Sequence, residues 1–191
     1  MDFINKDYEY YKKNGSKTAT LGRIEWRKNL DITYLMTHIT EVGCEQFGFV
    51  GLPAYSKVDF RHFYTSNISV AKAELAQLDK VFDLTFDKYG FEDIELGYRL
   101  YKNEVEIFYA PDVLVYHDHP YHSIKKFCKR QQDAGEELAV FKKLHPELTE
   151  AEIKMDLDGF RDCYEKEKRR QSRILGSAIW LLLQICIMLG S

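Results

Sequence analysis

The stretch FDKYGFEDIELGYRL, residues 86–100, carries the clearest signal of the fold. Glu92 and Asp93 stand side by side after Gly90, and apolar residues then recur at helical spacing, which predicts a helix from about Asp93 to Asn103. The helix N-terminus stabilises carboxylates in its first turn. Two hypotheses follow. The acids cap the helix, which spacing alone favours, or one of them stays ionised at neutral pH and acts as a general base.

Two further features of this helix predict how it packs. Glu95 and Arg99 are four residues apart in the order that favours an ion pair on a helix surface. Gly97 destabilises a helix interior by about 1 kcal/mol relative to alanine. We therefore expect a neighbouring group to pack closely against Gly97.

The composition is that of a folded globular chain. The 191 residues are 45% hydrophobic and 30% charged, which is enough for one domain with a core. The net charge of −3 argues against a protein built to hold nucleic acid. The four cysteines form no CxxC pair, and the start, MDFINKDYEYYKK, is too polar for a signal peptide. These features predict a reducing, cytoplasmic location.

The C-terminal region is different. The segment ILGSAIWLLLQICIMLG, residues 174–190, contains no charge and follows the basic run KEKRRQSR, residues 166–173. A spanning helix needs about 20 apolar residues, so the alternatives are a buried terminal helix, a membrane-associated segment, or neither. If it inserted, its basic flank would leave the main domain cytoplasmic. Peripheral membrane contact through residues 174–190 is therefore one expectation.

The remaining patterns mix helices and strands, which places the chain in the α/β or α+β class. They predict a polar helix over residues 1–14, strands over 18–26 and 60–69, a helix over 31–47 capped by Asp31, a short helix capped by Ser69, strand-like runs within 105–117, and a long helix over 122–144, broken or bent near Gly135 and ended by Pro146. Thr149 and Glu152 have the spacing of a capping box for a further helix.

A cluster of histidines follows the strand-like runs. The stretch VYHDHPYHS, residues 115–123, contains His117, His119 and His122. His117 and His119 are two residues apart at the end of a predicted strand, so their side chains are expected to share a face. Imidazole is a frequent metal ligand, and the cluster predicts a metal or phosphate site, with an ordinary polar loop as the alternative. A metal hydrolase built on the three histidines is the least supported hypothesis, because no HExxH-type spacing is present.

Taken together, these stretches resemble the C-terminal half of a family 2 glycosyltransferase of the GT-A fold. The resemblance is carried, in chain order, by LGRIEW (21–26), FYTSNISV (63–70), FEDIELGYRL (91–100), YAPDVLVYHDH (109–119), FCKRQQDAG (127–135) and HPEL (145–148). It implies an α/β fold with a mixed sheet and flanking helices. Residues 1–148 would form the C-terminal part of the GT-A domain, and residues 149–191 a helical tail that includes the apolar segment 174–190.

The resemblance also implies a reaction. Such enzymes transfer a sugar from a nucleotide-diphosphate sugar to a hydroxyl of a glycan or another acceptor, usually with inversion. In the family, the second acid of the pair is the general base, which here is Asp93, and Glu92 would help to position the acceptor.

The same resemblance implies the donor side of the site. His117 would be a ligand of Mg²⁺ or Mn²⁺, with His119 as a weaker candidate, and the ion would hold the diphosphate leaving group. Arg130 would reach the diphosphate, since a guanidinium suits phosphate oxygens. Asn67 and Ser69 would line the sugar pocket.

The chain departs from the family pattern in its first part. No DxD motif precedes LGRIEW, and the near match DLD at 156–158 lies downstream, in the predicted tail. We therefore expect the nucleotide-binding N-terminal half to be absent, because the chain is a fragment or because that half is a separate partner. The alternative function is a non-catalytic remnant or split-enzyme subunit that binds a partner or a membrane. Leu84 stands where the family often has Glu.

Overall fold

The structure, a computed structural model, describes residues 3–42, 46–149 and 152. The chain divides into two compact units that interleave along the sequence. Unit 1 takes its residues from 1–31, 47–84 and 92–119, and unit 2 takes its residues from 32–46, 85–91 and 120 onward. The two units are described separately below.

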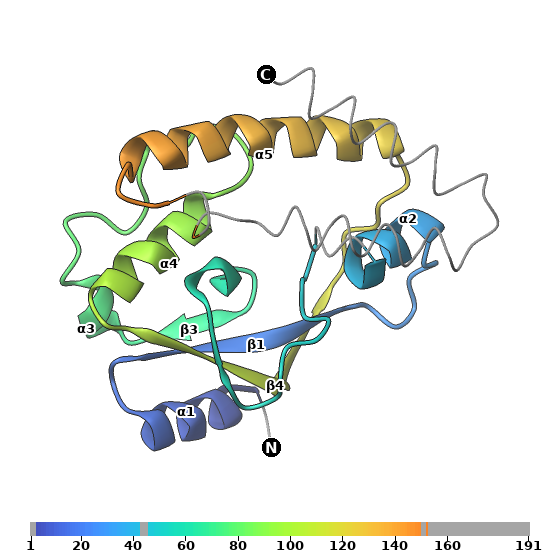
Figure 1. Cartoon of the computed structure of the whole chain (residues 1–191). Coiled ribbons are helices and arrows are strands. Elements are labelled where there is room, and N and C mark those ends of the chain that lie inside the picture. The colour runs from blue at the N-terminus through green and yellow to red at the C-terminus, as the bar shows by residue number, and fades with distance from the viewer. Residues whose placement is uncertain (1–2, 43–45, 150–151, 153–191) are drawn as a thin grey trace. The chain divides into compact units, whose positions relative to one another are not determined.

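Unit 1 is built on a four-stranded mixed sheet, which confirms the predicted α/β class (Figure 1). The strand order is β2-β4-β1-β3, with β1 Thr18–Trp26, β2 Lys57–Val58, β3 Ile68–Val70 and β4 Glu106–His117. The two long strands, β1 and β4, run parallel in the centre, and the short strands β2 and β3 pair antiparallel at the edges. The predicted strand over 18–26 is confirmed, and the runs within 105–117 form one strand.

Helices cover both faces of this sheet. Helix α1, Phe3–Asn14, packs on β1 and β4 from one side, and α4, Glu92–Lys102, lies on the other side with the 3-10 helix η2, Phe60–His62 (Figure 1). A short helix α3, Lys72–Leu75, follows β3. Residues 18–22 of β1 are all buried, so this strand is covered on both faces, and Leu21 and the Ile107 side chain of β4 are among the apolar residues of the core.

An insertion in β4 interrupts the pairing of the central strands. Gly22 pairs with Ala110, but the next residue of β1, Arg23, pairs with Leu114, so residues 111–113 bulge out of the ladder. The bulge contains Pro111, which has no N–H to donate to a neighbouring strand.

The bulge changes the face to which later side chains of β4 belong. Tyr109 pairs with Leu21, and His117 pairs with Trp26. Leu21 and Trp26 are five residues apart on a strand whose side chains alternate, so they lie on opposite faces. Tyr109 and His117 therefore also lie on opposite faces, although they are eight residues apart.

Helix α4 packs as its glycine predicts. A Cβ added to Gly97 would lie 2.4 Å from Cβ of Phe63 and 2.9 Å from the carbonyl oxygen of Phe60, which confirms the expected close approach. The predicted ion pair also forms, with Arg99 Nε 2.8 Å from Glu95 Oε1, but its expected surface location is wrong. Glu95 is buried, because α4 turns this carboxylate toward the protein and Arg99 covers it.

Unit 2 is helical in its described part. It contains α2, Tyr34–Thr37, the π-helix η1, His38–Val42, and the long helix α5, Ile124–Leu144. Helix α5 is continuous through Gly135, so the predicted break there is wrong, and it ends before Pro146 as predicted.

Specific contacts hold two loop regions of unit 2, one before α4 and one after α5. The loop over residues 85–91 packs on α5, where the Lys88 N–H donates to Glu137 Oε1 at 3.0 Å and the rings of Phe91 and Phe141 lie 5.9 Å apart. The Thr149 N–H donates to Glu152 and the Glu152 N–H donates back to Thr149 Oγ1, at 2.9 and 3.3 Å, which confirms the capping box.

Three other predictions are wrong. The helix over 31–47 begins only at Tyr34, with Thr33 rather than Asp31 as its N-cap, and changes to a π-helix at His38. The segment 60–69 forms η2 and a loop, and only its last residues join β3. Ser69 lies within β3, opposite Thr20, and does not cap α3.

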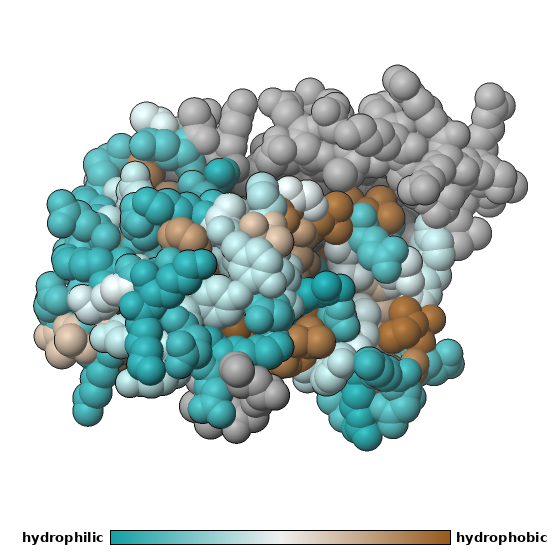
Figure 2. Space-filling model, turned by 90° about the horizontal axis from the view of Figure 1, so that it is seen from below, coloured by the Kyte–Doolittle hydropathy of each residue, from teal (hydrophilic) through white to brown (hydrophobic). Residues whose placement is uncertain are grey.

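Hydrophilic residues cover much of the face shown in Figure 2, and hydrophobic residues appear there as separate small patches. Among the helices in the described ranges, none has the length and apolar character needed to cross a membrane. The apolar segment 174–190 and the predicted helical tail beyond residue 152 lie outside the described residues.

Candidate active site

The acid pair lies where the sequence predicts it, in the first turn of α4. Gly90 and Phe91 have φ angles of 110° and 68°, so the chain makes a left-handed turn immediately before the helix. Gly90 adopts this conformation without strain, whereas Phe91 is held in it by burial. The turn delivers Glu92 and Asp93 directly into the helix start.

Main-chain N–H groups hold the carboxylate of Asp93. The Ile94 N–H donates to Asp93 Oδ1 at 2.8 Å, and the backbone N–H groups of Thr65 and of Asp93 itself also bond to this carboxylate. Burial, together with the nearby carboxylate of Glu92, nevertheless raises the pKa of Asp93 to about 6, although the N–H donors partly oppose both effects.

This environment suits a general base. With a pKa of about 6, Asp93 is mostly ionised at neutral pH and is a stronger base than an ordinary carboxylate. A pKa near the working pH makes proton transfer in both directions efficient. The start of α4 thus holds a carboxylate whose protonation changes close to neutral pH.

Thr65 is a member of this site that sequence reasoning did not single out. It lies in the loop between η2 and β3, within the quoted stretch FYTSNISV, and its main chain joins this stretch to Asp93. Almost every residue has a backbone N–H, so the residue type at position 65 could not identify this donor. The sequence indicated it only through the joint occurrence of FYTSNISV and FEDIELGYRL in the resemblance.

Asn67, expected to line a sugar pocket, is a structural connector. Its side-chain Nδ2 donates to the carbonyl oxygens of Arg23 and Val113, at 2.8 and 2.9 Å, and so fills the bulge of β4. A Cβ on Gly22 would lie 2.2 Å from this nitrogen. The sugar contact of Asn67 stays a prediction that these hydrogen bonds do not support, and Ser69 lies half-buried in the edge strand β3.

His117 and His119 come together at the carboxyl ends of the parallel strands. The His117 ring lies 5.3 Å from Trp26 and 5.0 Å from Phe47, and the His117 and His119 ring centroids are 6.1 Å apart. Ligands of α/β sheets bind beyond the carboxyl ends of parallel strands. Trp26 and Phe47 were not predicted site residues, although Trp26 ends the quoted stretch LGRIEW.

The described residues do not by themselves fit a Mg²⁺ or Mn²⁺ site. Within residues 3–42, 46–149 and 152, no group of three or more His, Cys, Asp or Glu side chains is arranged to hold a metal ion. Asp118, between the two histidines, forms an ion pair with Arg27. Mg²⁺ prefers oxygen ligands, and two imidazoles do not complete its coordination.

Arg130 belongs to unit 2, on α5. Its guanidinium lies 3.6 Å from the ring centroid of Tyr89 and 5.4 Å from that of Tyr121, a cation–π arrangement that fixes the side chain. The guanidinium is thus held in position and can donate hydrogen bonds to phosphate oxygens.

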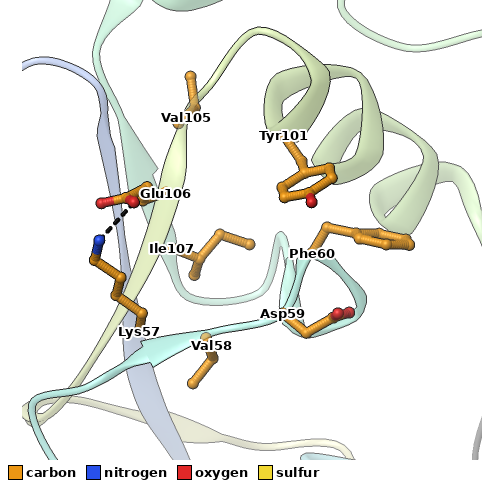
Figure 3. Close-up of a pocket in the computed structure, with 8 residues that line it drawn as sticks. All are labelled: Lys57, Val58, Asp59, Phe60, Tyr101, Val105, Glu106 and Ile107. Carbon is orange, nitrogen blue, oxygen red and sulfur yellow. Dashed lines mark hydrogen bonds and ion pairs between the residues drawn. The ribbon is translucent and has the colours of Figure 1, made fainter. Parts of the chain in front are cut away.

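A hollow of about 140 Å³ lies elsewhere in unit 1, between β2, η2, the end of α4 and the start of β4 (Figure 3). Phe60, Tyr101 and Ile107 form its apolar wall, and an ion pair of 2.5 Å between Lys57 and Glu106 borders it. None of the predicted site residues lines this hollow.

Comparison of the chain with family models, with curated proteins and with solved structures finds no match. The structural features of unit 1 that bear on function are the acid pair, its main-chain donors and the ring cluster at the ends of β1 and β4.

Proposed function

We propose that this chain supplies the catalytic base and the acceptor side of a nucleotide-sugar glycosyltransferase that resembles family 2 and has the GT-A fold. The observation that carries the proposal is the carboxylate of Asp93. It is held at the start of α4 by main-chain N–H groups from two separate segments, and burial raises its pKa to about 6. A plain helix cap would not require this second segment or this burial.

In the proposed reaction, Asp93 takes the proton of the acceptor hydroxyl. The hydroxyl oxygen attacks the anomeric carbon of the donor, and the bond from that carbon to the diphosphate oxygen breaks on the opposite side. The configuration at the anomeric carbon is therefore inverted. Glu92, adjacent in the same helical turn, would accept a hydrogen bond from the acceptor and orient it.

Mg²⁺ or Mn²⁺ remains part of the proposal as a partner of the diphosphate. His117 would be one ligand and His119 a second candidate, and the remaining ligands would have to come from other groups. Arg130, in unit 2, stays a proposed contact of a phosphate group. Because the described residues alone do not fit the ion, no step of the reaction above depends on it.

The test compares Asp93→Asn with Asp87→Asn, an exposed acid in the preceding loop that serves as the matched control. Release of nucleoside diphosphate is measured with a panel of UDP-, GDP- and dTDP-sugars, hydroxyl acceptors and Mn²⁺. We expect Asp93→Asn to lower turnover by at least about 100-fold, as removal of a general base does, and Asp87→Asn to leave it nearly unchanged.

Equal turnover in Asp93→Asn and the unchanged chain would refute the assignment of the base. A second result would favour the alternative, a non-catalytic subunit. This result is no turnover with any donor, together with no rise in melting temperature when UDP or GDP is added with Mn²⁺.

A further inference from the structure

One loop of unit 1 exposes a cluster of large apolar side chains. In the segment over residues 80–84, which we call the apolar loop, Val81 is 41% exposed, Phe82 43% and Leu84 92%. Single exposed apolar residues are normal on protein surfaces. Three within four residues form a local patch, and such patches mark interaction sites.

Hydrogen bonds from α4 hold the backbone of the apolar loop. The guanidinium of Arg99 donates to the carbonyl oxygens of Lys80 and Val81, at 2.5 and 2.6 Å, while it pairs with Glu95, which is 2% exposed. Lys80 also lies 2.7 Å from the carboxylate of Asp83, which is 7% exposed. These carbonyl groups and the carboxylate of Asp83 are thus paired. The outward surface of the loop consists of the three apolar side chains and the side chain of Lys80, which is 47% exposed.

The small size of this patch favours a lipid bilayer over a protein as its partner. A stable protein interface buries about 800 Å² on each side, which three side chains cannot supply. A lipid bilayer needs less from any one contact, because apolar side chains enter the interfacial layer individually and several weak attachments add up. The sequence holds a second feature of that kind, the basic run 166–173 followed by the uncharged segment 174–190.

We propose that the apolar loop inserts Val81, Phe82 and Leu84 into the interfacial layer of a lipid bilayer. It would act as a membrane contact separate from residues 174–190. This membrane contact is independent of the proposed glycosyltransferase activity.

The test reads the environment of the loop itself with tryptophan fluorescence in the full chain. The two native tryptophans are Trp26 and Trp180, and Trp180 lies in the apolar segment. All proteins therefore carry Trp180→Phe. Phe82→Trp places a probe in the loop, and Val50→Trp places one at another exposed apolar position of unit 1, 62% exposed, as the matched control. Vesicles contain phosphatidylcholine and phosphatidylglycerol, with bromine atoms on the acyl chains as quenchers.

We expect the emission of the Phe82→Trp protein to shift to the blue and to be quenched by the brominated lipids. The Val50→Trp protein should show no quenching beyond that of Trp26. Adding Leu84→Asp should lower the partition of the Phe82→Trp protein into vesicles by about tenfold or more, the effect of losing one buried leucine. Circular dichroism of each variant checks that the fold is retained.

Three results would overturn the inference. The first is a chain that does not sediment with the vesicles at all. The second is a chain that binds while the probe at position 82 stays unquenched, which would assign all binding to other residues. The third is equal quenching at positions 82 and 50, which would show adsorption without a preferred loop.

Discussion

The same substitution should have opposite effects in two helices of this protein. Replacing glycine by alanine in a helix interior stabilises it by about 1 kcal/mol, because the backbone of alanine loses less entropy on folding. At Gly135 of α5, nothing lies within 4 Å of the added methyl group, so the full gain is expected. At Gly97 of α4 the methyl would meet Cβ of Phe63 at 2.4 Å and the carbonyl oxygen of Phe60 at 2.9 Å.

Neither of these neighbours is the free end of a flexible side chain, and Phe63 is fully buried. Relieving the overlap therefore requires η2 to move, and overpacking of this kind destabilises by about 1–3 kcal/mol. After subtraction of the helix gain, Gly97→Ala should lower the free energy of unfolding by up to about 2 kcal/mol, while Gly135→Ala raises it by up to about 1 kcal/mol.

The measurement is urea unfolding followed by far-UV circular dichroism for both variants and the unchanged chain. A melting experiment gives a second estimate, since 1 kcal/mol corresponds to a shift of about 2–4 °C in a chain of this size. If Gly97→Ala is more stable than the unchanged chain, as Gly135→Ala is expected to be, the close packing of α4 on η2 is refuted. In the same experiment, Gly135→Ala shows whether replacing glycine by alanine in an open helix position stabilises this protein, as assumed.

Three further predictions concern polar groups of unit 1. Because the folded pKa of Asp93, about 6, lies above the unfolded value of about 3.9, the unchanged chain loses stability as pH rises between these values. On going from pH 4 to pH 8, the stability of Asp93→Asn should therefore rise by about 2 kcal/mol relative to that of the unchanged chain in urea unfolding. No relative gain would contradict the burial of this carboxyl. Glu95→Ala leaves Arg99 without its buried partner and should lower the free energy of unfolding by about 3 kcal/mol in the same urea experiment. A loss below about 1 kcal/mol would indicate that water solvates this ion pair. Asn67→Ala removes two hydrogen bonds to buried carbonyl groups and should destabilise by about 2 kcal/mol, whereas the exposed neighbour Ser66→Ala should change little; equal effects would argue against a connector role.

The elements that local signals specify were predictable from the sequence. The strand over 18–26 alternates β-forming residues, and α4 combines acids in its first turn with an apolar face. The capping box of Thr149 and Glu152 is complete within four residues. The close contact at Gly97 was also predictable, since a glycine in a helix interior is unfavourable without a packing reason.

The failures occur where residues outside a segment override its local pattern. Thr33 caps α2 in place of Asp31 because its hydroxyl also donates to the carbonyl oxygen of Tyr121, 88 residues away, at 2.8 Å. In the segment 60–69, the side chain of Asp59 accepts from the Arg61 N–H and starts a 3-10 turn. Asn67 then bonds to the bulge of β4. No periodicity within either segment encodes these partners.

The candidate site was predictable in part. The acid pair and the two histidines were found from their residue types. The structure places the acids in the first turn of α4, His117 at the end of β4 and His119 two residues beyond it. The raised pKa of Asp93 was not predictable, because it depends on burial by other segments and on N–H donors that any residue could provide.

The bulge in β4 makes the length of the chain between Ala110 and Leu114 as important as its composition. Ala110 and Leu114 pair with the adjacent residues Gly22 and Arg23, so they lie on opposite faces although three residues separate them. The bulge therefore reverses the alternation of β4 once, and this places His117 beside Trp26. A deletion of one residue would leave an even number between them, so that regular alternation alone would keep His117 on its present face. A deletion of two would leave an odd number, and His117 would keep its face only if the reversal remained. Deletions of one and of two residues should therefore differ in their effect on His117, a constraint that no substitution scan can reveal.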